Sequence, residues 1–395
     1  MKTAGIICEY NPIHKGHVRH IEATRGLVGE DCAVVCVMSG NFTQRGDFAV
    51  FQKHARAASA VAAGADLVLE LPLACALSSA ERFARGGVML LNALGVCTHI
   101  SFGSETGETD SLREVAECLA TDEVNNCVAE ELKTGVSYAR ARYAAAGKIL
   151  GKKADVLLTP NNILAVEYLK ALGETASAMA PLTVKRFGAA HDSDGAESAS
   201  ALRRLLKEGA EPWGLMPARS AEILKREIEA GCGPVFIENA ETALLSRLRL
   251  LPDEAFAALP DAAEGLALRL RRFCRTMPTV QSILESAKTK RYALSRLRRM
   301  LLCAALGLTD GQVGAPPAYI RVLAMNQKGM GVLREIGKKS ALPVITKPAQ
   351  ARALDGPAKA MFLKEAAATD FYALAYPKQE NRSGGGEWVT SPRVL

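Results

Sequence analysis

Two histidines near the start of the chain have the spacing expected of phosphate ligands. His14 and His17 lie three residues apart on either side of Gly16, directly after Asn11-Pro12. If a helix begins here, its first turn offers unpaired backbone N–H groups and the positive end of the helix dipole, both of which attract phosphate. Gly16 leaves room for a nucleotide close to the backbone, and residues three apart share one helical face. We therefore predict that His14 and His17 are catalytic and stabilise charge on an α-phosphate during its displacement.

Histidines at a helix start have other common roles. They can cap the helix or pack against it, and a pair at this spacing can bind zinc. The chain has only six histidines, and no cysteine or carboxylate completes a zinc ligand set around this pair. We expect no protein-bound metal.

Apolar runs along the first half predict the sheet that positions this motif. Continuous apolar segments, typical of strands buried on both faces, alternate with segments of helical periodicity. The expected strands are 3–8, 33–38, 66–71, 99–102 and 182–186, and the expected helices are 15–25, 52–63, 80–94, 112–119, 163–172 and 198–207. This alternation predicts an α/β fold with a Rossmann-like parallel sheet. Right-handed crossovers would gather the polar loops along one edge.

The second half of the chain has a different texture. From about residue 213 it reads as long helices rich in Leu, Ala and Arg, and 395 residues exceed the roughly 250 to 300 at which one core stops growing. We predict a nucleotide-binding domain over 1–212 and a mainly α-helical domain over 213–380. A flexible tail is expected over 381–395, because its polar, glycine-rich start has little apolar surface.

Bulk properties argue against membrane and secreted classes. The longest apolar run, 300–308, is half of the ~18 residues that a membrane span needs. The apolar stretch 4–8 meets Glu9 too early for a secretory signal. None of the ten cysteines forms a Cys-x-x-Cys pair, which is typical of thiols in a reducing compartment. We expect a cytoplasmic protein that contacts no membrane.

A basic segment in the second half predicts a polyanionic partner. The formal charge is +7, and between Arg269 and Arg299 ten Lys and Arg residues face the single acid Glu285. Such a block is an electrostatic footprint for nucleic acid, although a charged run can also be a solvated helix face. Tyr292 could stack on a base. The predicted tRNA contacts are Lys288, Lys290, Arg291, Tyr292, Arg296, Arg298 and Arg299.

The first strand, the Asn-Pro loop and His14-Lys15-Gly16-His17 resemble the HIGH signature of nucleotidyltransferases and class I aminoacyl-tRNA synthetases. That superfamily often carries an Ile-Ser-Ser-Thr-x-x-Arg element that holds the β- and γ-phosphates. Segment 197–203 is similar, with Glu197 in place of Ile and Ser200 in place of Thr. The resemblance implies that Arg203 is a fork-shaped phosphate ligand, while Ser198 could also be an ordinary helix cap.

Longer segments carry a more specific resemblance. Residues 9–17, 37–46, 69–72, 102–105, 160–164, 288–292 and 296–300 are similar to the bacterial tRNA(Met) cytidine acetate ligases. The resemblance implies that ATP, accompanied by Mg²⁺, activates acetate as acetyl-adenylate with release of pyrophosphate. The acetyl group would then pass to the wobble cytidine of elongator tRNA(Met), forming N4-acetylcytidine.

The same resemblance implies a set of ATP contacts. Gly103 could equally be a plain turn glycine, and an asparagine at 161 or 162 could only cap the next helix. The alignment does not choose between the two asparagines, and we favour Asn161. Lys15 is given no duty of its own. Together with Ser198, Ser200 and Arg203 from the superfamily motif, the predicted contacts are Ile7, Cys8, Glu9, Tyr10, Asn11, Pro12, Ile13, His14, Lys15, Gly16, His17, Val18, Arg19, His20, Gly103, Asn161, Asn162 and Arg186.

Two other functions are compatible with the motif. A nucleotidyltransferase could adenylate or cytidylate a small metabolite, but such an enzyme has little use for the basic segment. A non-catalytic RNA-binding protein with a relict nucleotide fold would not need both histidines and Arg203. The leading hypothesis is therefore an RNA-modifying ligase.

Overall fold

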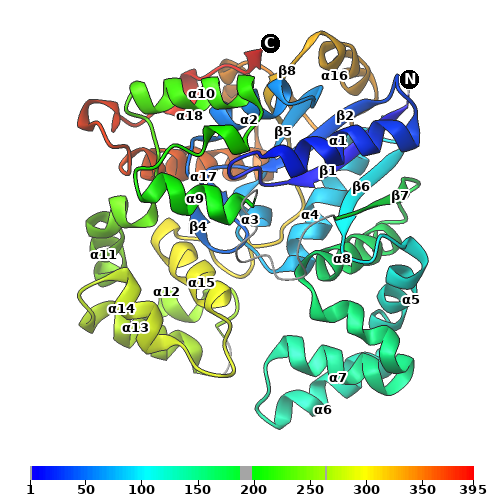
Figure 1. Ribbon diagram of the computed structural model, residues 1–395. Coiled ribbons are helices and arrows are strands. Elements are labelled where there is room, and N and C mark those ends of the chain that lie inside the picture. Colours follow the sequence, from blue (N-terminus) through cyan, green and yellow to red (C-terminus); the bar gives the residue numbers. More distant parts are fainter. Residues whose placement is uncertain (1, 187–197, 263–264) are drawn as a thin grey trace.

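The computed structural model describes residues 2–186, 198–262 and 265–395 and contains, within them, an eight-stranded sheet (Figure 1). Its strand order is β10-β8-β5-β2-β1-β6-β7, and β9 pairs with β8. A two-stranded hairpin, β3 with β4, lies apart from it. The strands are β1 (Thr3–Cys8), β2 (Ala33–Ser39), β3 (Phe42–Thr43), β4 (Asp47–Phe48), β5 (Leu67–Leu71), β6 (His99–Ser104), β7 (Ala180–Lys185), β8 (Ile320–Met325), β9 (Val344–Ile345) and β10 (Arg393–Val394).

The central strands are parallel, as the apolar runs predicted. β1 pairs in parallel with both β2 and β6, β2 pairs with β5, and β6 pairs with β7. Every residue of β2 and of β5 is buried. Continuous apolar sequence is required there because helices cover both faces of the sheet.

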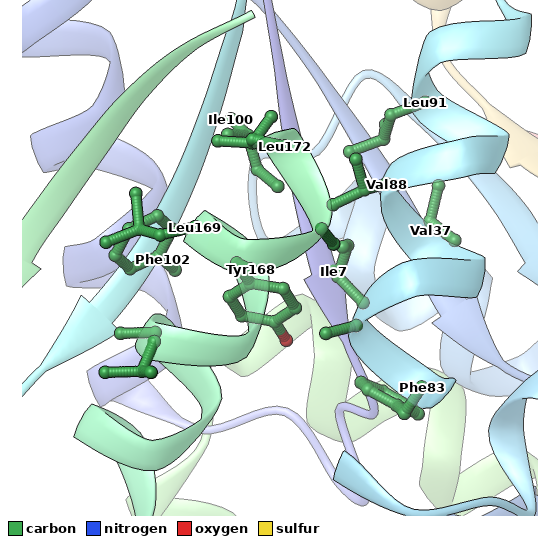
Figure 2. Packing of buried hydrophobic residues seen from close by; sticks show 14 of the residues in the cluster. Ile7, Val37, Phe83, Val88, Leu91, Ile100, Phe102, Tyr168, Leu169 and Leu172 are labelled. Carbon is green, nitrogen blue, oxygen red and sulfur yellow. The ribbon is translucent and has the colours of Figure 1, made fainter. Parts of the chain in front are cut away.

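Successive residues of a strand point to opposite faces, and each face has its own core. Ile7 and Val37 pack with α4 (Ala80–Ala93) and α8 (Pro160–Glu174), as Figure 2 shows. The neighbouring Ile6 and Cys36 pack on the other face, against α1, α2, α9 and α10. Those helices are α1 (Lys15–Val28), α2 (Lys53–Ala62), α9 (Ala199–Lys207) and α10 (Ala218–Glu229).

A helical insertion between β6 and α8 was not predicted beyond its first helix. α5 (Thr109–Leu119) is followed by a hairpin of α6 (Asp122–Lys133) and α7 (Tyr138–Leu150), and then by the 3-10 helix η1 (Gly151–Leu158). The hairpin extends away from the sheet (Figure 1). The inner face of the hairpin is buried and carries Val124, Val128, Ala141 and Ala145.

The rest of the chain is mainly helical, as expected, and its helices form a third core. Leu270, Ile283, Leu301 and Tyr372 are among the residues that meet there. The helices not yet named are α3 (Leu73–Ala76), α11 (Glu241–Leu250), α12 (Asp253–Ala257), α13 (Leu266–Thr276), α14 (Val280–Ala287), α15 (Leu294–Leu306), α16 (Gln327–Lys339), α17 (Gly356–Ala373) and α18 (Gly386–Val389). Across the described ranges, no helix is long and apolar enough to cross a bilayer.

The predicted division of the second half needs correction at two places. β8 joins the sheet antiparallel to β5, so residues 213–380 are not a separate helical unit. The expected flexible tail over 381–395 is wrong, because α18 forms there and β10 pairs with β8. Glu387 is only 1% exposed and makes ion pairs with Lys53 (2.6 Å) and Arg321 (3.3 Å). The polar composition of this segment predicted disorder. It could not show that Glu387 is paired, because Lys53 and Arg321 lie far away in sequence.

The buried ion pairs of Glu387 give the first prediction. Burial opposes ionisation of this carboxyl, but Lys53 and Arg321 hold its pKa at about 2. Glu387→Gln leaves Arg321 buried without its carboxylate, so the free energy of unfolding should fall by about 3 kcal/mol, as measured by urea titration. Glu380→Gln, at an exposed site just before this segment, should change the free energy of unfolding by less than about 0.5 kcal/mol. Equal urea midpoints for the two variants would contradict the conclusion that ion pairs of Glu387 hold the C-terminal segment in place.

Candidate active site

The loop between β1 and α1 is held in one shape by distant parts of the chain. The side-chain oxygen of Asn11 accepts a hydrogen bond from Val50 N (2.8 Å), and the Asn11 carbonyl accepts one from Arg203 Nη1 (2.8 Å). The Glu9 carboxylate accepts from Gln44 N (2.7 Å). Tyr10 has a positive φ of 43° and is 2% exposed. The loop that precedes the two histidines is therefore fixed by tertiary contacts.

His14 and His17 lie face to face at the first turn of α1. Their ring centroids are 3.8 Å apart. Gly16 N donates to His14 Nδ1 (3.1 Å), and His14 N donates to His17 Nδ1 (3.2 Å). Because each Nδ1 accepts a hydrogen bond, each neutral ring carries its proton on Nε2. The pair thus caps the helix, as the structural alternative held, and also presents two Nε2–H donors.

The surroundings of these imidazoles keep them neutral. Burial, reinforced by the positive charges of Arg186 and Arg19, lowers the pKa of His14 to about 4. Burial and then His14 lower the pKa of His17 well below its usual value. Burial and Arg186 lower that of His20 to about 4, and its Nε2 lies 3.0 Å from Ser101 Oγ. At neutral pH the site therefore supplies hydrogen-bond donors and the charge of Arg186, which suits an anion.

Two further predicted residues, Gly103 and Arg186, lie beside this turn. Arg186 N donates to the Ser104 carbonyl (2.9 Å) just after β7. A Cβ on Gly103 would come within 3.2 Å of Arg186 Cγ, so glycine leaves room for this arginine. The electrostatic effect of Arg186 on all three histidines places its charge close to them.

The structure distinguishes the two asparagines at the start of α8. Asn162 is 3% exposed, and its side-chain oxygen accepts from Glu105 N (2.9 Å) and Thr106 N (3.3 Å). Asn161 is partly exposed and its amide donates to Glu105 Oε1 (2.7 Å). Asn162 is occupied in shaping the loop after β6, so Asn161 is the better candidate for a nucleotide contact.

Arg203 connects the predicted phosphate-binding segment 197–203 to the loop that precedes the two histidines. Besides its bond to the Asn11 carbonyl, Arg203 donates to Ser200 Oγ (3.0 Å). Ser198 caps α9 by accepting from Ala201 N (3.1 Å), which is the ordinary role considered for it. Glu197 lies outside the described residues.

One residue that organises the loop edge was not predicted. Arg56 on α2 is 1% exposed and donates to the carbonyls of Glu9, Gly40 and Ser39, the last at 2.8 Å. It thereby joins the loops that follow β1 and β2. It lies inside a helix without a recognisable motif, so no sequence signal identified it.

The predicted tRNA contacts fall into two groups. Lys288 and Lys290 are exposed, and Arg291, Arg296 and Arg298 are partly exposed. Tyr292 and Arg299 are each only 8% exposed, so neither offers the expected RNA-facing surface. The Tyr292 ring lies under Arg296 (5.2 Å), and Arg299 Nη1 donates to the Gln44 carbonyl (3.4 Å). One face of α15 packs against the protein, so the basic residues on that face are buried. The number of Lys and Arg residues in the segment does not show which of them lie on that face.

A parallel sheet whose first loop carries His-x-Gly-His at a helix start defines a nucleotidyl-transfer protein of the HIGH class. A sequence model of the HIGH Nucleotidyl Transferase family matches residues 1–386. The chain is 37% identical to a protein of Acetivibrio thermocellus over the full length of both, and 39% identical to one of Thermoanaerobacter sp. over 95% of this chain and 96% of that protein. Both are named tRNA(Met) cytidine acetate ligase.

Two solved structures show the same fold. The apo form I of Thermotoga maritima TmcAL superposes with a TM-score of 0.94 at 36% identity, covering all of both chains. Its form II, bound with alpha-thio ATP, gives a TM-score of 0.91 at 37% identity over the same coverage. The chain belongs to the tRNA(Met) cytidine acetate ligase family, within the HIGH nucleotidyl transferases.

The lowered histidine pKa values predict how stability depends on pH. A His20 pKa of about 4 in the folded state and about 6.5 in the unfolded state means that the unfolded chain binds more protons between these values. The free energy of unfolding should therefore fall as the pH drops from about 6.5 to 4. In His20→Gln, the slope measured by urea titration should decrease by about 1 kcal/mol per pH unit. His99 is less buried, and burial lowers its pKa as well, so His99→Gln should reduce the slope by less than His20→Gln does. Equal reductions in the two variants would refute the burial argument.

Proposed function

We propose that this chain uses ATP to activate acetate as acetyl-adenylate and transfers the acetyl group to the wobble cytidine of elongator tRNA(Met). The observation that carries the proposal is the pair of neutral imidazoles at the first turn of α1, beside Arg186, with Arg203 bound to the Asn11 carbonyl of the preceding loop. The names of the relatives and the alpha-thio ATP in one of them support the same reaction.

The first step is an attack of acetate oxygen on the α-phosphorus, with pyrophosphate as the leaving group. Negative charge grows on the α-phosphate oxygens, and preorganised donors that meet it lower the barrier. His14 and His17 offer Nε2–H groups that are already protonated and need no proton from solvent. Arg186 and Arg203 supply fixed positive charge for the phosphates.

In the second step the exocyclic amine of cytosine attacks the acetyl carbon. A C–N bond forms, the bond from the acetyl carbon to the adenylate oxygen breaks, and AMP leaves while N4 loses a proton. We propose that the remaining contacts from Ile7 to His20, together with Gly103 and Asn161, hold the nucleotide. Within the described residues, no cluster of three or more potential ligand side chains could hold a metal ion. We propose that Mg²⁺ enters with the ATP phosphates, because this ion is usually held by substrate phosphates, waters and only one or two carboxylates.

The basic segment argues against a nucleotidyltransferase that acts on a small metabolite. The exposed Lys288 and Lys290 favour RNA, because cationic side chains in an accessible loop release counterions from a phosphate backbone. A tRNA substrate also places the enzyme in the cytoplasm, where we propose that it acts.

Removing either imidazole should affect turnover more than folding. His14→Ala and His17→Ala should each reduce acetate-dependent pyrophosphate release from ATP by at least about 10², because a transition-state donor is lost. Glu22→Ala, an exposed position on the same helix, is the control and should retain full turnover. Near-normal turnover in both histidine variants would exclude them from the mechanism. Acetate-independent release in the parent enzyme would reject the proposed function itself.

The exposed lysines before α15 should contribute to tRNA affinity. In the double variant Lys288→Ala with Lys290→Ala, tRNA should bind more weakly, and the dependence of log K on log salt should flatten by about 2, or 1 per lysine. Filter binding across a salt series measures both, and ATP affinity should not change. Lys338→Ala, which removes an exposed cation on α16, should leave tRNA binding as it was. An unchanged salt slope in the double variant would place the RNA elsewhere.

A further inference from the structure

A cavity beside the proposed ATP site lies between the β3–β4 hairpin, α9 and the helical half, and shares only Arg203 with the predicted ATP contacts. Its volume is about 260 Å³, just below the roughly 300 to 1,000 Å³ of typical small-molecule sites. Its walls come from β4, α9, the segment 236–241, α14 and α15. A cavity of this size suits one planar ring better than two rings stacked on each other.

The cavity adjoins the loop that carries the histidines. Arg203 and Val50 line it, and these two residues also hold Asn11 through hydrogen bonds of 2.8 Å each. A group bound in the cavity therefore lies next to the loop that we propose holds ATP. Such a position suits the second substrate of the transfer step.

Its polar lining contains three carboxylates, Asp47, Glu238 and Glu241, together with Arg203, Arg204, Lys207, Gln281 and Arg298. Glu238 pairs with Lys207 (2.6 Å), and Glu241 accepts a hydrogen bond from Val280 N (2.8 Å). Asp47 Oδ1 accepts from Phe48 N (2.9 Å), and a carboxylate retains further lone pairs for a ligand. Burial raises the pKa of Asp47, while Arg298 and Arg203 oppose that rise, so both guanidinium groups act on this carboxylate.

Apolar and aromatic groups complete the walls. Phe48 is buried, Phe236 is partly exposed, and Val280 and Leu284 lie on α14. RNA-binding proteins often place splayed-out bases against aromatic rings while polar groups read the base edge. The exposed lysines at 288 and 290 precede α15, the helix that carries Arg298, so the basic surface leads to the cavity.

We propose that this cavity receives the cytosine base of the tRNA, turned out of its stack, and that Asp47 accepts a hydrogen bond from its exocyclic amine. The proposal rests on the proposed function and names where its second substrate binds. Enzymes that modify a base commonly extrude it into such a pocket.

The chemistry of the walls selects cytosine over uracil. The Watson–Crick edge of cytosine has an amine donor beside two acceptors, and the Asp47 carboxylate next to the guanidinium fork of Arg298 offers one acceptor beside two donors. Uracil has a carbonyl oxygen where cytosine has its amine, so it would place this oxygen against the Asp47 carboxylate. Asp47 is therefore a specificity-determining residue rather than part of the ATP site.

The experiment separates the two steps of the reaction in the full-length enzyme. Asp47→Asn should retain acetate-dependent exchange of pyrophosphate into ATP within about twofold, and should lose about 10- to 100-fold in kcat/KM for acetyl transfer to tRNA. It should also reduce the preference for tRNA with cytidine over the same tRNA with uridine at that position, as measured by filter binding. Glu174→Gln, on an exposed part of α8, is the control and should change none of the three.

The outcomes distinguish this proposal from the proposed function. A parallel loss of exchange and transfer would assign the cavity to the adenylate and overturn the proposal, as would normal transfer with an unchanged cytidine preference. Absence of exchange in the parent enzyme would reject the proposed function, and the tRNA binding preference would still decide on the cavity.

A second variant tests the space itself. Gln281 is exposed and lines the cavity, so Gln281→Trp should fill it and reduce acetyl transfer while exchange continues. Glu254→Trp adds the same bulk at an exposed site on α12 that does not line the cavity and should have no effect. Equal transfer rates in the two tryptophan variants would show that the cavity is not entered.

Discussion

The shape of the loop between β1 and α1 depends on hydrogen bonds from residues that are distant in sequence. Val50 N and Arg203 bind Asn11, and Arg56 binds the Glu9 carbonyl. Each bond satisfies a backbone or amide group that would otherwise be costly to leave without a partner. These bonds fix where α1 begins, and the hydrogen bonds that His14 Nδ1 and His17 Nδ1 accept within the first turn then hold the two rings 3.8 Å apart. The chemistry proposed for the site follows from this constraint.

Contacts with α9 and α15 help to position the loop between β1 and α1, although both helices lie far from it in sequence. Arg203 brings α9 to the loop, and Gly46, with φ of 77°, brings the loop between β3 and β4 into close contact with the backbone of Arg298 and Arg299. A side chain at position 46 would collide with that backbone. The helical half is therefore anchored beside the nucleotide loop, and the cavity with Asp47 is formed where they meet.

A second set of charges fastens the end of the chain to the sheet. Lys53 is 1% exposed and contacts the carboxylates of both Glu70 and Glu387. Its pKa is raised although burial opposes this, because the carboxylates stabilise the charged form. α2 thus contributes Arg56 to the loop edge and Lys53 to the C-terminal segment. One helix couples the two regions.

The sequence by itself determined the parallel strands and the helix that starts at the histidines. Both depend on local patterns: apolar runs, an Asn-Pro breaker and a glycine at the turn. It also predicted Arg203 as a phosphate ligand, because that motif is short and contiguous, and the structure shows this arginine bound to the Asn11 carbonyl. Only the tertiary structure decided that β8 and β10 join the sheet, that Arg299 and Tyr292 are buried, and that Asp47 faces two arginines. These features arise from contacts between residues far apart in the chain. The periodicity of apolar residues and the number of charges along a sequence do not show which distant residue will bury or pair with a polar group.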